Sequence, residues 1–180
     1  MTAHRRFLYI STFCLMVAVA ACAASRKATP TEIPLLVEPI LSSQICLPAA
    51  KNWTATWISS QDSLRQMMSR VLSHRIGGIS HKVPPIDFSS YGILAVEMGE
   101  QRTAGYGFDS KAVSAYMTGT IAVVKLVWHR PDPGSHTAQL MTSPCILLRL
   151  PKKSYNTIRV IDKQGLIVTS VALHKAKASQ

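Results

Sequence analysis

The side chains of this 180-residue chain with the most varied chemistry are its four cysteines, Cys14, Cys22, Cys46 and Cys145. A thiol can be acylated, form a disulfide, bind a metal or act as a nucleophile, depending on its surroundings. No pattern of a known catalytic site accompanies them: the sequence has no Gly-x-Ser-x-Gly elbow, no Walker loop and no His-Glu-x-x-His helix. Its histidines do not have the spacing of a zinc site. We therefore expect a protein that is not an enzyme and that holds no metal and no cofactor.

The first 21 residues have the pattern of an export signal. Arg5 and Arg6 precede a mostly apolar run over residues 7–21. The run is shorter than the ~20 residues that a membrane-spanning helix needs. A short buried helix is the alternative, but it would leave the two arginines unexplained. We expect residues 1–21 to be a signal peptide, and Cys14 to be removed with it.

The cysteine directly after this run lies in the sequence Val19-Ala20-Ala21-Cys22. An aliphatic residue, two small residues and a cysteine resemble the lipobox of bacterial lipoproteins, in which the thiol takes a thioether-linked diacylglycerol. Each buried CH₂ of such a chain adds about 0.8 kcal/mol of membrane affinity, so acylated Cys22 would anchor the protein. The resemblance, with Ala23 next, implies the outer membrane of a Gram-negative cell, on its periplasmic side. Ordinary cleavage after Ala21, leaving Cys22 unmodified, is the alternative.

The chain is strongly basic, with 20 Lys+Arg against 9 Asp+Glu and a formal net charge of +11. A cluster of this charge would favour a nucleic-acid ligand, because Lys and Arg release counterions from phosphates. Most of the basic residues instead recur singly along the sequence; Lys152-Lys153 and Lys175 with Lys177 come close together, and Arg5 and Arg6 belong to the predicted signal peptide. We expect no nucleic-acid partner, because an exported protein is separated from the nucleic acids of the cytoplasm. Anionic ligands outside the cytoplasm are lipid headgroups at the membrane surface and the polymers of the envelope.

The remaining sequence divides into a tether, a domain and a tail. Residues 22–50 comprise the predicted lipidated cysteine and a tether with few large apolar groups, which ends in an extended segment at 35–41 that is interrupted by Pro39. Residues 51–174 are predicted to form one β-rich domain. Residues 175–180 are a basic tail, expected to be solvated and frayed.

Within the domain, one amphipathic helix is predicted, with N-cap candidates in the run Ser59-Ser60-Gln61-Asp62, where Ser59 and Asp62 have capping-box spacing. Its apolar face has the spacing i, i+3, i+4, i+7 and i+8, and consists of Leu64, Met67, Met68, Val71 and Leu72. We interpret the methionines as core residues rather than copper ligands. Gly77-Gly78 is expected to end the helix.

Strands are predicted where β-branched and aromatic residues gather between turn signals, at residues 53–58, 91–98, 112–118, 120–128, 145–150, 157–161 and 166–173. The last two flank Asp162-Lys163-Gln164-Gly165 and predict a hairpin. The expected fold is mainly β with one helix (α+β): an antiparallel β-sandwich or partly open barrel, preceded by the amphipathic helix.

Four short motifs follow one another along these strands: Ile86-Asp87-Phe88, Gly99-Glu100-Gln101-Arg102-Thr103-Ala104-Gly105-Tyr106, Pro131-Asp132-Pro133-Gly134 and Thr142-Ser143-Pro144. Their order resembles the PrcB C-terminal domain family over roughly residues 53–162. Ala104 stands where that pattern prefers glycine. The resemblance implies a binding module, because the founding member is a subunit that stabilises a cell-surface protease complex. It carries over no catalytic residues.

The second motif supplies the candidate binding loop, formed by Gly99, Arg102, Thr103, Gly105 and Tyr106. Its glycines permit backbone angles that are closed to other residues, and its tyrosine offers a large amphipathic surface. One interpretation of this composition is a recognition loop. The other, which we favour, is a tight turn whose tyrosine closes the core.

The function predicted from these features is that of a lipid-anchored cell-envelope protein whose domain binds or stabilises another envelope protein. The alternative is a chagasin-like protease inhibitor, since residues 99–108 and Trp128-His129-Arg130-Pro131 resemble, with changed order, the inhibitory loops of that family. An enzyme of unfamiliar type is a third hypothesis.

Cys46 and Cys145 remain once Cys14 is removed and Cys22 acylated. An oxidising compartment permits a disulfide between them. In the chain-entropy model, closing a loop of about 100 residues adds up to about 4.7 kcal/mol. The sequence does not show whether the two are adjacent, and two free buried thiols are the alternative.

Overall fold

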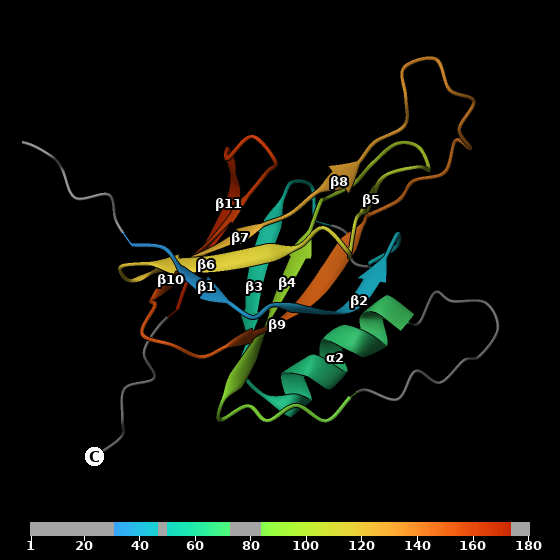
Figure 1. The fold of residues 1–180 in the computed structure, drawn as a ribbon. Helices are drawn as coiled ribbons and strands as arrows, with labels where there is room; N and C mark the ends of the chain where they lie inside the picture. Colours follow the sequence, from blue (N-terminus) through green and yellow to red (C-terminus); the bar gives the residue numbers. More distant parts are fainter. Residues whose placement is uncertain (1–30, 47–49, 73–83, 174–180) are drawn as a thin grey trace, which may run out of the picture. The chain divides into compact units, whose positions relative to one another are not determined.

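The structure is a computed structural model that describes residues 31–46, 50–72 and 84–173 (Figure 1). The predicted signal peptide, Cys22, the first part of the tether, Gly77-Gly78 and the basic tail lie outside the described residues. No helix in the described ranges is long and apolar enough to cross a membrane.

Within the described ranges, two large β-sheets and one helix form three layers (Figure 1). The outer sheet has the strand order β1-β6-β7-β10-β11, with β1 at Ile33–Leu35, β6 at Ser114–Thr118, β7 at Ile121–Lys125, β10 at Thr157–Ile161 and β11 at Ile167–Ala172. The central sheet has the order β2-β9-β4-β3, with β2 at Glu38–Ser43, β9 at Cys145–Pro151, β4 at Tyr91–Glu97 and β3 at Thr54–Ile58. A short ribbon pairs β5 (Gly107–Phe108) with β8 (Trp128–His129). Helix α2 (Gln61–Leu72) covers the free face of the central sheet.

The central sheet is buried on both faces, which explains why its inner strands are almost continuously apolar. Successive side chains of a strand point to opposite faces. In β4, Leu94 and Val96 enter the core between the two sheets, whereas Ile93 and Ala95 enter the core beneath α2. The central sheet therefore joins two hydrophobic cores.

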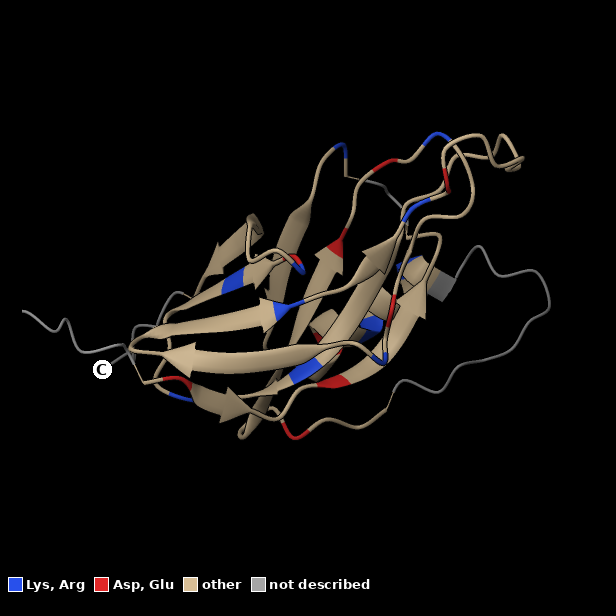
Figure 2. Cartoon of the chain, turned by 45° about the horizontal axis from the view of Figure 1, so that its top comes forward, with Lys and Arg blue, Asp and Glu red and all other residues tan. Residues whose placement is uncertain are grey.

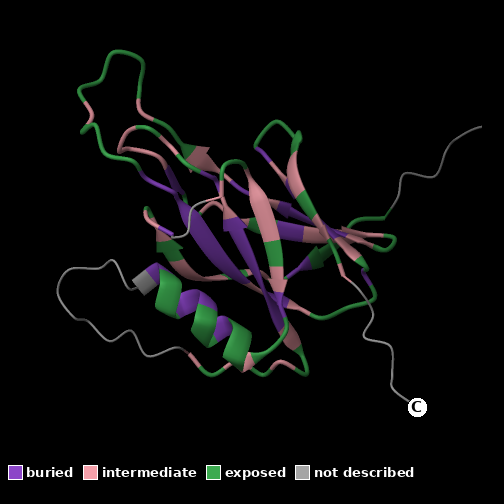
Figure 3. Cartoon of the chain, turned by 180° about the vertical axis from the view of Figure 1, so that it is seen from behind, coloured by how far each residue is buried: buried purple, intermediate pink, exposed green. Residues whose placement is uncertain are grey.

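Helix α2 is positioned by its apolar face. Leu64, Met67, Met68 and Val71 are each at most 5% exposed and pack on the central sheet, so both methionines are core residues. Figure 3 shows this buried face turned to the strands and the exposed face turned outward. The helix is capped by Ser60, whose Oγ accepts a bond from the Ser63 N–H at 3.2 Å. Among the predicted cap candidates, Ser60 is therefore the residue that caps the helix.

The predicted class, mainly β with one helix, is confirmed, and neither large sheet closes into a barrel. Each predicted strand has a counterpart, but residues 120–128 form two strands, β7 and β8. The segment interrupted by Pro39 forms β1 and β2, and β2 has a register shift between Pro39 and Leu41. Because β2 is an edge strand, its proline can be accommodated there.

One pairing differs from an all-antiparallel arrangement: β10 pairs parallel to β7, from Thr157↔Ile121 to Ile161↔Lys125. The outer sheet is therefore mixed. After β7 the chain crosses to the central sheet to form β9 and then returns to the outer sheet as β10. That crossover brings β10 back in the direction of β7.

Candidate recognition site at the loop end of the domain

Two loops lie side by side at one end of the domain. We call residues 99–106, which follow β4, the glycine loop, and residues 130–144, which follow β8, the proline loop. In Figure 1 both extend from the end of the molecule at which β5 and β8 lie. Three of the four motifs that carry the PrcB resemblance fall within these two loops.

Main-chain hydrogen bonds tie the two loops together. Gln101 and Thr142 exchange both N–H···O bonds, at 2.8 and 2.9 Å, and the Ala104 N–H donates to the Ala138 oxygen at 3.0 Å. The Thr142 hydroxyl donates to the Thr103 oxygen at 3.1 Å. These bonds fix the backbone of a segment that has little regular secondary structure of its own. Ala104, which stands where the family pattern prefers glycine, takes part in them through its backbone N–H.

The glycines of this region are required by both conformation and space. Gly99 and Gly105 have φ values of +83° and +94°, in the left-handed region that favours glycine. A Cβ on Gly105 would lie 2.9 Å from the Pro131 ring, and one on Gly107 would lie 2.8 Å from the His129 ring. The glycines therefore let the glycine loop and β5 approach the residues that begin the proline loop.

The five predicted loop residues differ in their exposure. Gly99 is buried, whereas Thr103, Gly105 and Tyr106 are half-buried. Tyr106 packs against the core between the sheets, as the tight-turn interpretation expects. Arg102 is exposed and is the one side chain of the five that is fully available to a partner.

The proline loop offers more accessible surface than the glycine loop, although none of its residues was among the predicted binding residues. Residues 132–136 are exposed, and Leu140 and Met141 are 55% and 63% exposed. The two are adjacent and form a contiguous exposed apolar patch, the kind of surface that marks interaction sites when it is large enough. The only sequence signal was an apolar Leu-Met pair within a turn-rich segment.

An aromatic cluster supports the base of the two loops. The Trp53 ring lies 4.7 Å from the Trp128 ring and 5.7 Å, edge to face, from the Phe108 ring, measured between centroids. Such pairs add about 0.5–1.5 kcal/mol beyond the burial of their area. Trp53 comes from the residue before β3, Phe108 from β5 and Trp128 from β8, so the cluster joins the β5–β8 ribbon to the central sheet.

A pocket of about 420 Å³ lies beside β8, between this strand and the turn that follows β10. It is lined by residues 126–130 and by Asp162, Lys163 and Gln164 of the turn between β10 and β11. His129, Arg130 and Lys163 are exposed and make this lining basic. Asp162 is buried, and its Oδ1 accepts a 2.7 Å bond from the Leu166 N–H, which fixes the turn.

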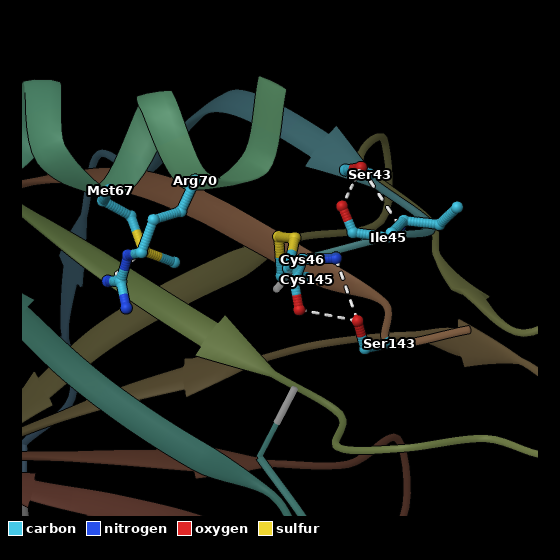
Figure 4. Close-up of a disulfide and its surroundings, with 7 residues drawn as sticks. All are labelled: Ser43, Ile45, Cys46, Met67, Arg70, Ser143 and Cys145. Atoms are coloured by element: carbon cyan, nitrogen blue, oxygen red, sulfur yellow. Dashed lines mark hydrogen bonds between the residues drawn. A yellow bond between two sulfur atoms is a disulfide. The ribbon is translucent and has the colours of Figure 1, made fainter. Parts of the chain in front are cut away.

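Cys46 and Cys145 are joined by a disulfide with a Cα–Cα distance of 6.0 Å (Figure 4). Both are almost completely buried, beneath α2. Ser143 supports the same contact: its Oγ donates to the Cys46 oxygen at 2.6 Å and accepts from the Cys46 N–H at 2.9 Å. The bridge therefore fixes the point at which the proline loop enters β9.

Two titratable groups of the described residues, one at each end of the central sheet, are affected by burial. Burial raises the pKa of the Glu97 carboxyl, and the positive charge of Arg70 partly opposes that shift. Burial also raises the pKa of the Tyr155 hydroxyl, to about 12. Glu97 ends β4, two residues before Gly99. No group of three or more His, Cys, Asp or Glu in the described ranges could hold a metal ion.

The basic residues are dispersed over the structure rather than gathered in one stripe (Figure 2). Among the described residues the ion pairs are Arg65–Asp62 on α2 and Arg149–Glu38 between β9 and β2. Arg149 also lies over the Tyr91 ring, 4.9 Å from its centroid. The Arg149 contacts join β9 to β2 and β4, whereas Arg65–Asp62 lies within α2.

Residues 93–151 match the family model described as PrcB C-terminal. The match begins in β4, ends in β9 and includes both loops and the β5–β8 ribbon. The match supports the similarity to the PrcB C-terminal family over these residues, a shorter stretch than the resemblance over residues 53–162 suggested. No curated protein and no solved structure matches the chain.

Proposed function

We propose that this protein is a binding module of the bacterial cell envelope, which holds or stabilises another envelope protein through the glycine and proline loops. One observation carries the proposal: the residues that match the PrcB C-terminal model contain both loops, and hydrogen bonds hold the loops side by side. A backbone fixed in advance lowers the entropy cost of ordering a binding surface.

The side chains at this end suit binding rather than catalysis. Leu140 and Met141 provide exposed apolar surface, and Arg102 provides an exposed charge beside them in the paired loop. Protein interfaces are enriched in methionine, arginine and aromatic residues. We therefore propose that the protein is not an enzyme and acts through contact with a protein partner.

The proposed location is the outer membrane, with a lipid on Cys22 and the domain on the periplasmic side. The buried disulfide between Cys46 and Cys145 supports an oxidising compartment. Globomycin treatment of expressing cells, with Cys22→Ala as the control, tests the anchor. We expect both to abolish lipid-dependent processing and membrane fractionation; unchanged processing in both would refute lipidation.

Site-specific photo-crosslinking in intact cells tests the binding role. A photoreactive amino acid at position 141 should give a discrete crosslinked species that mass spectrometry identifies as one protein. Position 153 serves as the matched control, because Tyr91 pairs with Pro151 and Glu97 pairs with Cys145, so residues just after β9 lie at the opposite end of the central sheet. Repeated absence of a product specific to position 141 would contradict the proposal.

Protease inhibition is a second candidate. The observation that favours it is the pairing of Gly107 with His129, which places the two segments that resemble inhibitory loops next to each other. Purified protein should then inhibit papain-type or subtilisin-type proteases. Full activity of both types at high micromolar concentrations of this protein would eliminate it.

A further inference from the structure

The pocket beside β8 lies where the outer sheet divides. Up to Lys125 and Ile161, β7 and β10 pair in parallel, and the Leu126 N–H extends this ladder with a 3.0 Å bond to the Ile161 oxygen. Beyond that point the chain after Ile161 turns back toward β11, while the chain after Leu126 continues into β8. We call the pocket between these two diverging segments the fork.

The main chain of Trp128 faces the fork. The Asp109 N–H donates to the Val127 oxygen at 2.9 Å, and His129 pairs with Gly107. In an antiparallel ladder, alternate residues direct their N–H and C=O groups to the partner strand. Since Val127 and His129 face β5, Trp128 must direct both groups to the other side. This alternation agrees with the Leu126 N–H, which points to β10.

This outer edge of β8 has no strand partner within the described part of the chain, because the ribbon consists of β5 and β8 alone. An unpaired edge can be extended by a strand from another protein. The length of the open edge is small, so the side chains around it must supply part of the affinity.

Those side chains are basic. Arg130 continues from β8, and Lys163 lies across the fork in the turn after β10; both are exposed, and neither makes an ion pair with a described residue. The one carboxylate in the lining, Asp162, is engaged by the Leu166 N–H. The fork therefore combines the main-chain N–H and C=O of Trp128, which no described strand pairs with, and two cationic side chains, Arg130 and Lys163.

We propose that the fork binds an extended acidic segment of the partner protein, which pairs with the main chain of Trp128 and places carboxylates at Arg130 and Lys163. The inference rests on the proposed function and adds the chemistry of the partner. The two cations of the fork complement an acidic segment, and the open edge of β8 complements an extended backbone. These two properties define the partner segment.

Panning a phage-displayed library of 12-residue peptides on the purified full chain tests this proposal. We expect enrichment of acidic peptides with alternating β-branched residues. For the most enriched peptide, fluorescence anisotropy should show that R130E/K163E weakens binding at least about tenfold, as expected for close charge pairs. K153E/R159E makes the same change in net charge at exposed positions outside the pocket lining and should bind within about twofold.

The backbone pairing is tested on the peptide. N-methylation of alternate residues, in the register that removes the N–H groups facing the fork, should weaken binding about tenfold or more, whereas the other register should have little effect. Equal effects of the two registers, or complete competition by pyrophosphate, would show a plain anion site and overturn the strand pairing. Failure to enrich acidic peptides, or equal binding by R130E/K163E, would also overturn it.

The peptide-binding test of the fork and the crosslinking test of the proposed function can fail independently of each other. A specific crosslink at position 141 together with no peptide binding at the fork would refute this inference and leave the binding role intact. Peptide binding at the fork without any crosslink at position 141 would refute the role of the two loops instead.

Discussion

Loss of the bridge between Cys46 and Cys145 should remove a large part of the stability of the domain. The two residues are 99 apart in sequence, so the bond restricts a very long loop of the unfolded chain. The chain-entropy model assigns such a loop about 4.7 kcal/mol at 25 °C. Small domains have total unfolding free energies of about 5–15 kcal/mol, so the reduced protein should be only marginally stable.

The native contacts around the bridge should survive its removal. The main-chain and side-chain bonds between Ser143 and Cys46 do not involve sulfur, and the Ser143 N–H also donates to the Gln44 oxygen at 3.0 Å. The loss should therefore come mainly from the unfolded state, which becomes less restricted. Reduction should raise the urea m-value, because a chain without the cross-link exposes more surface on unfolding.

Urea titration followed by tryptophan fluorescence measures the effect. We expect the oxidised protein to lose about 4–5 kcal/mol of unfolding free energy on reduction. The variant C46A/C145A should resemble the reduced protein and should not respond to reductant, which separates the bridge from the packing of two small buried side chains. A loss of less than about 1 kcal/mol on reduction would refute the reasoning, since it would mean that the bridge does not limit the unfolded chain.

Four further outcomes follow from packing, hydrogen bonding and ionisation. Gly92→Ala should lower the free energy of unfolding by about 1–3 kcal/mol, because the added Cβ would lie 1.9 Å from the Trp57 ring. W57L should partly restore the stability of this variant, and an unchanged thermal melt of Gly92→Ala would contradict the packing. Leu64→Ala should cost about 2–5 kcal/mol in urea titration, since Leu64 is fully buried, and a near-neutral result would refute the placement of α2. Thr142→Val should loosen the glycine loop at a cost of about 1 kcal/mol, seen as faster hydrogen exchange there and refuted by unchanged exchange. Burial raises the pKa of the Glu97 carboxyl, so its ionisation destabilises the folded protein as pH rises from the pKa of the unfolded chain through that of the folded one. E97Q should therefore gain stability over the parent as pH rises above about 4, the ordinary range of a glutamate pKa, and a pH-independent difference would contradict this.

Much of the secondary structure could be predicted because its signal is local. The i, i+3, i+4 spacing of Leu64, Met67 and Met68 identified the buried face of α2, and this face packs on the central sheet. The turn sequence after Ile161 predicted the β10–β11 hairpin, which the structure contains. The exact cap was less determined, because Ser59 and Ser60 are adjacent and both can accept a backbone bond.

Pairing between distant strands could not be predicted in the same way. Residues 120–128 are one β-prone run in sequence, yet they form two strands, because the run leaves its partner β10 after Leu126 and joins β5 instead. The fork and its open edge result from this division. Periodicity reports which residues are buried, but it does not report which strands become neighbours.

At the candidate site, too, the local features could be predicted from the sequence and the contacts between distant segments could not. The glycine loop was identified from its composition, and its positive φ values at Gly99 and Gly105 agree with the reason for that composition. Its hydrogen-bonded partner, the proline loop, and the exposed Leu140 and Met141 became evident only in three dimensions.

The sequence alone determined those features that depend on neighbouring residues: the class of fold, the amphipathic helix, most strand positions and the glycine-rich turn. Tertiary structure decided which distant segments meet: the parallel pairing of β7 with β10, the contact between the two loops, the fork beside β8 and the disulfide between Cys46 and Cys145. The physical reason is range. Backbone propensity and side-chain periodicity act over a few residues, whereas strand order is selected by burying both faces of the central sheet at once, which depends on the whole chain.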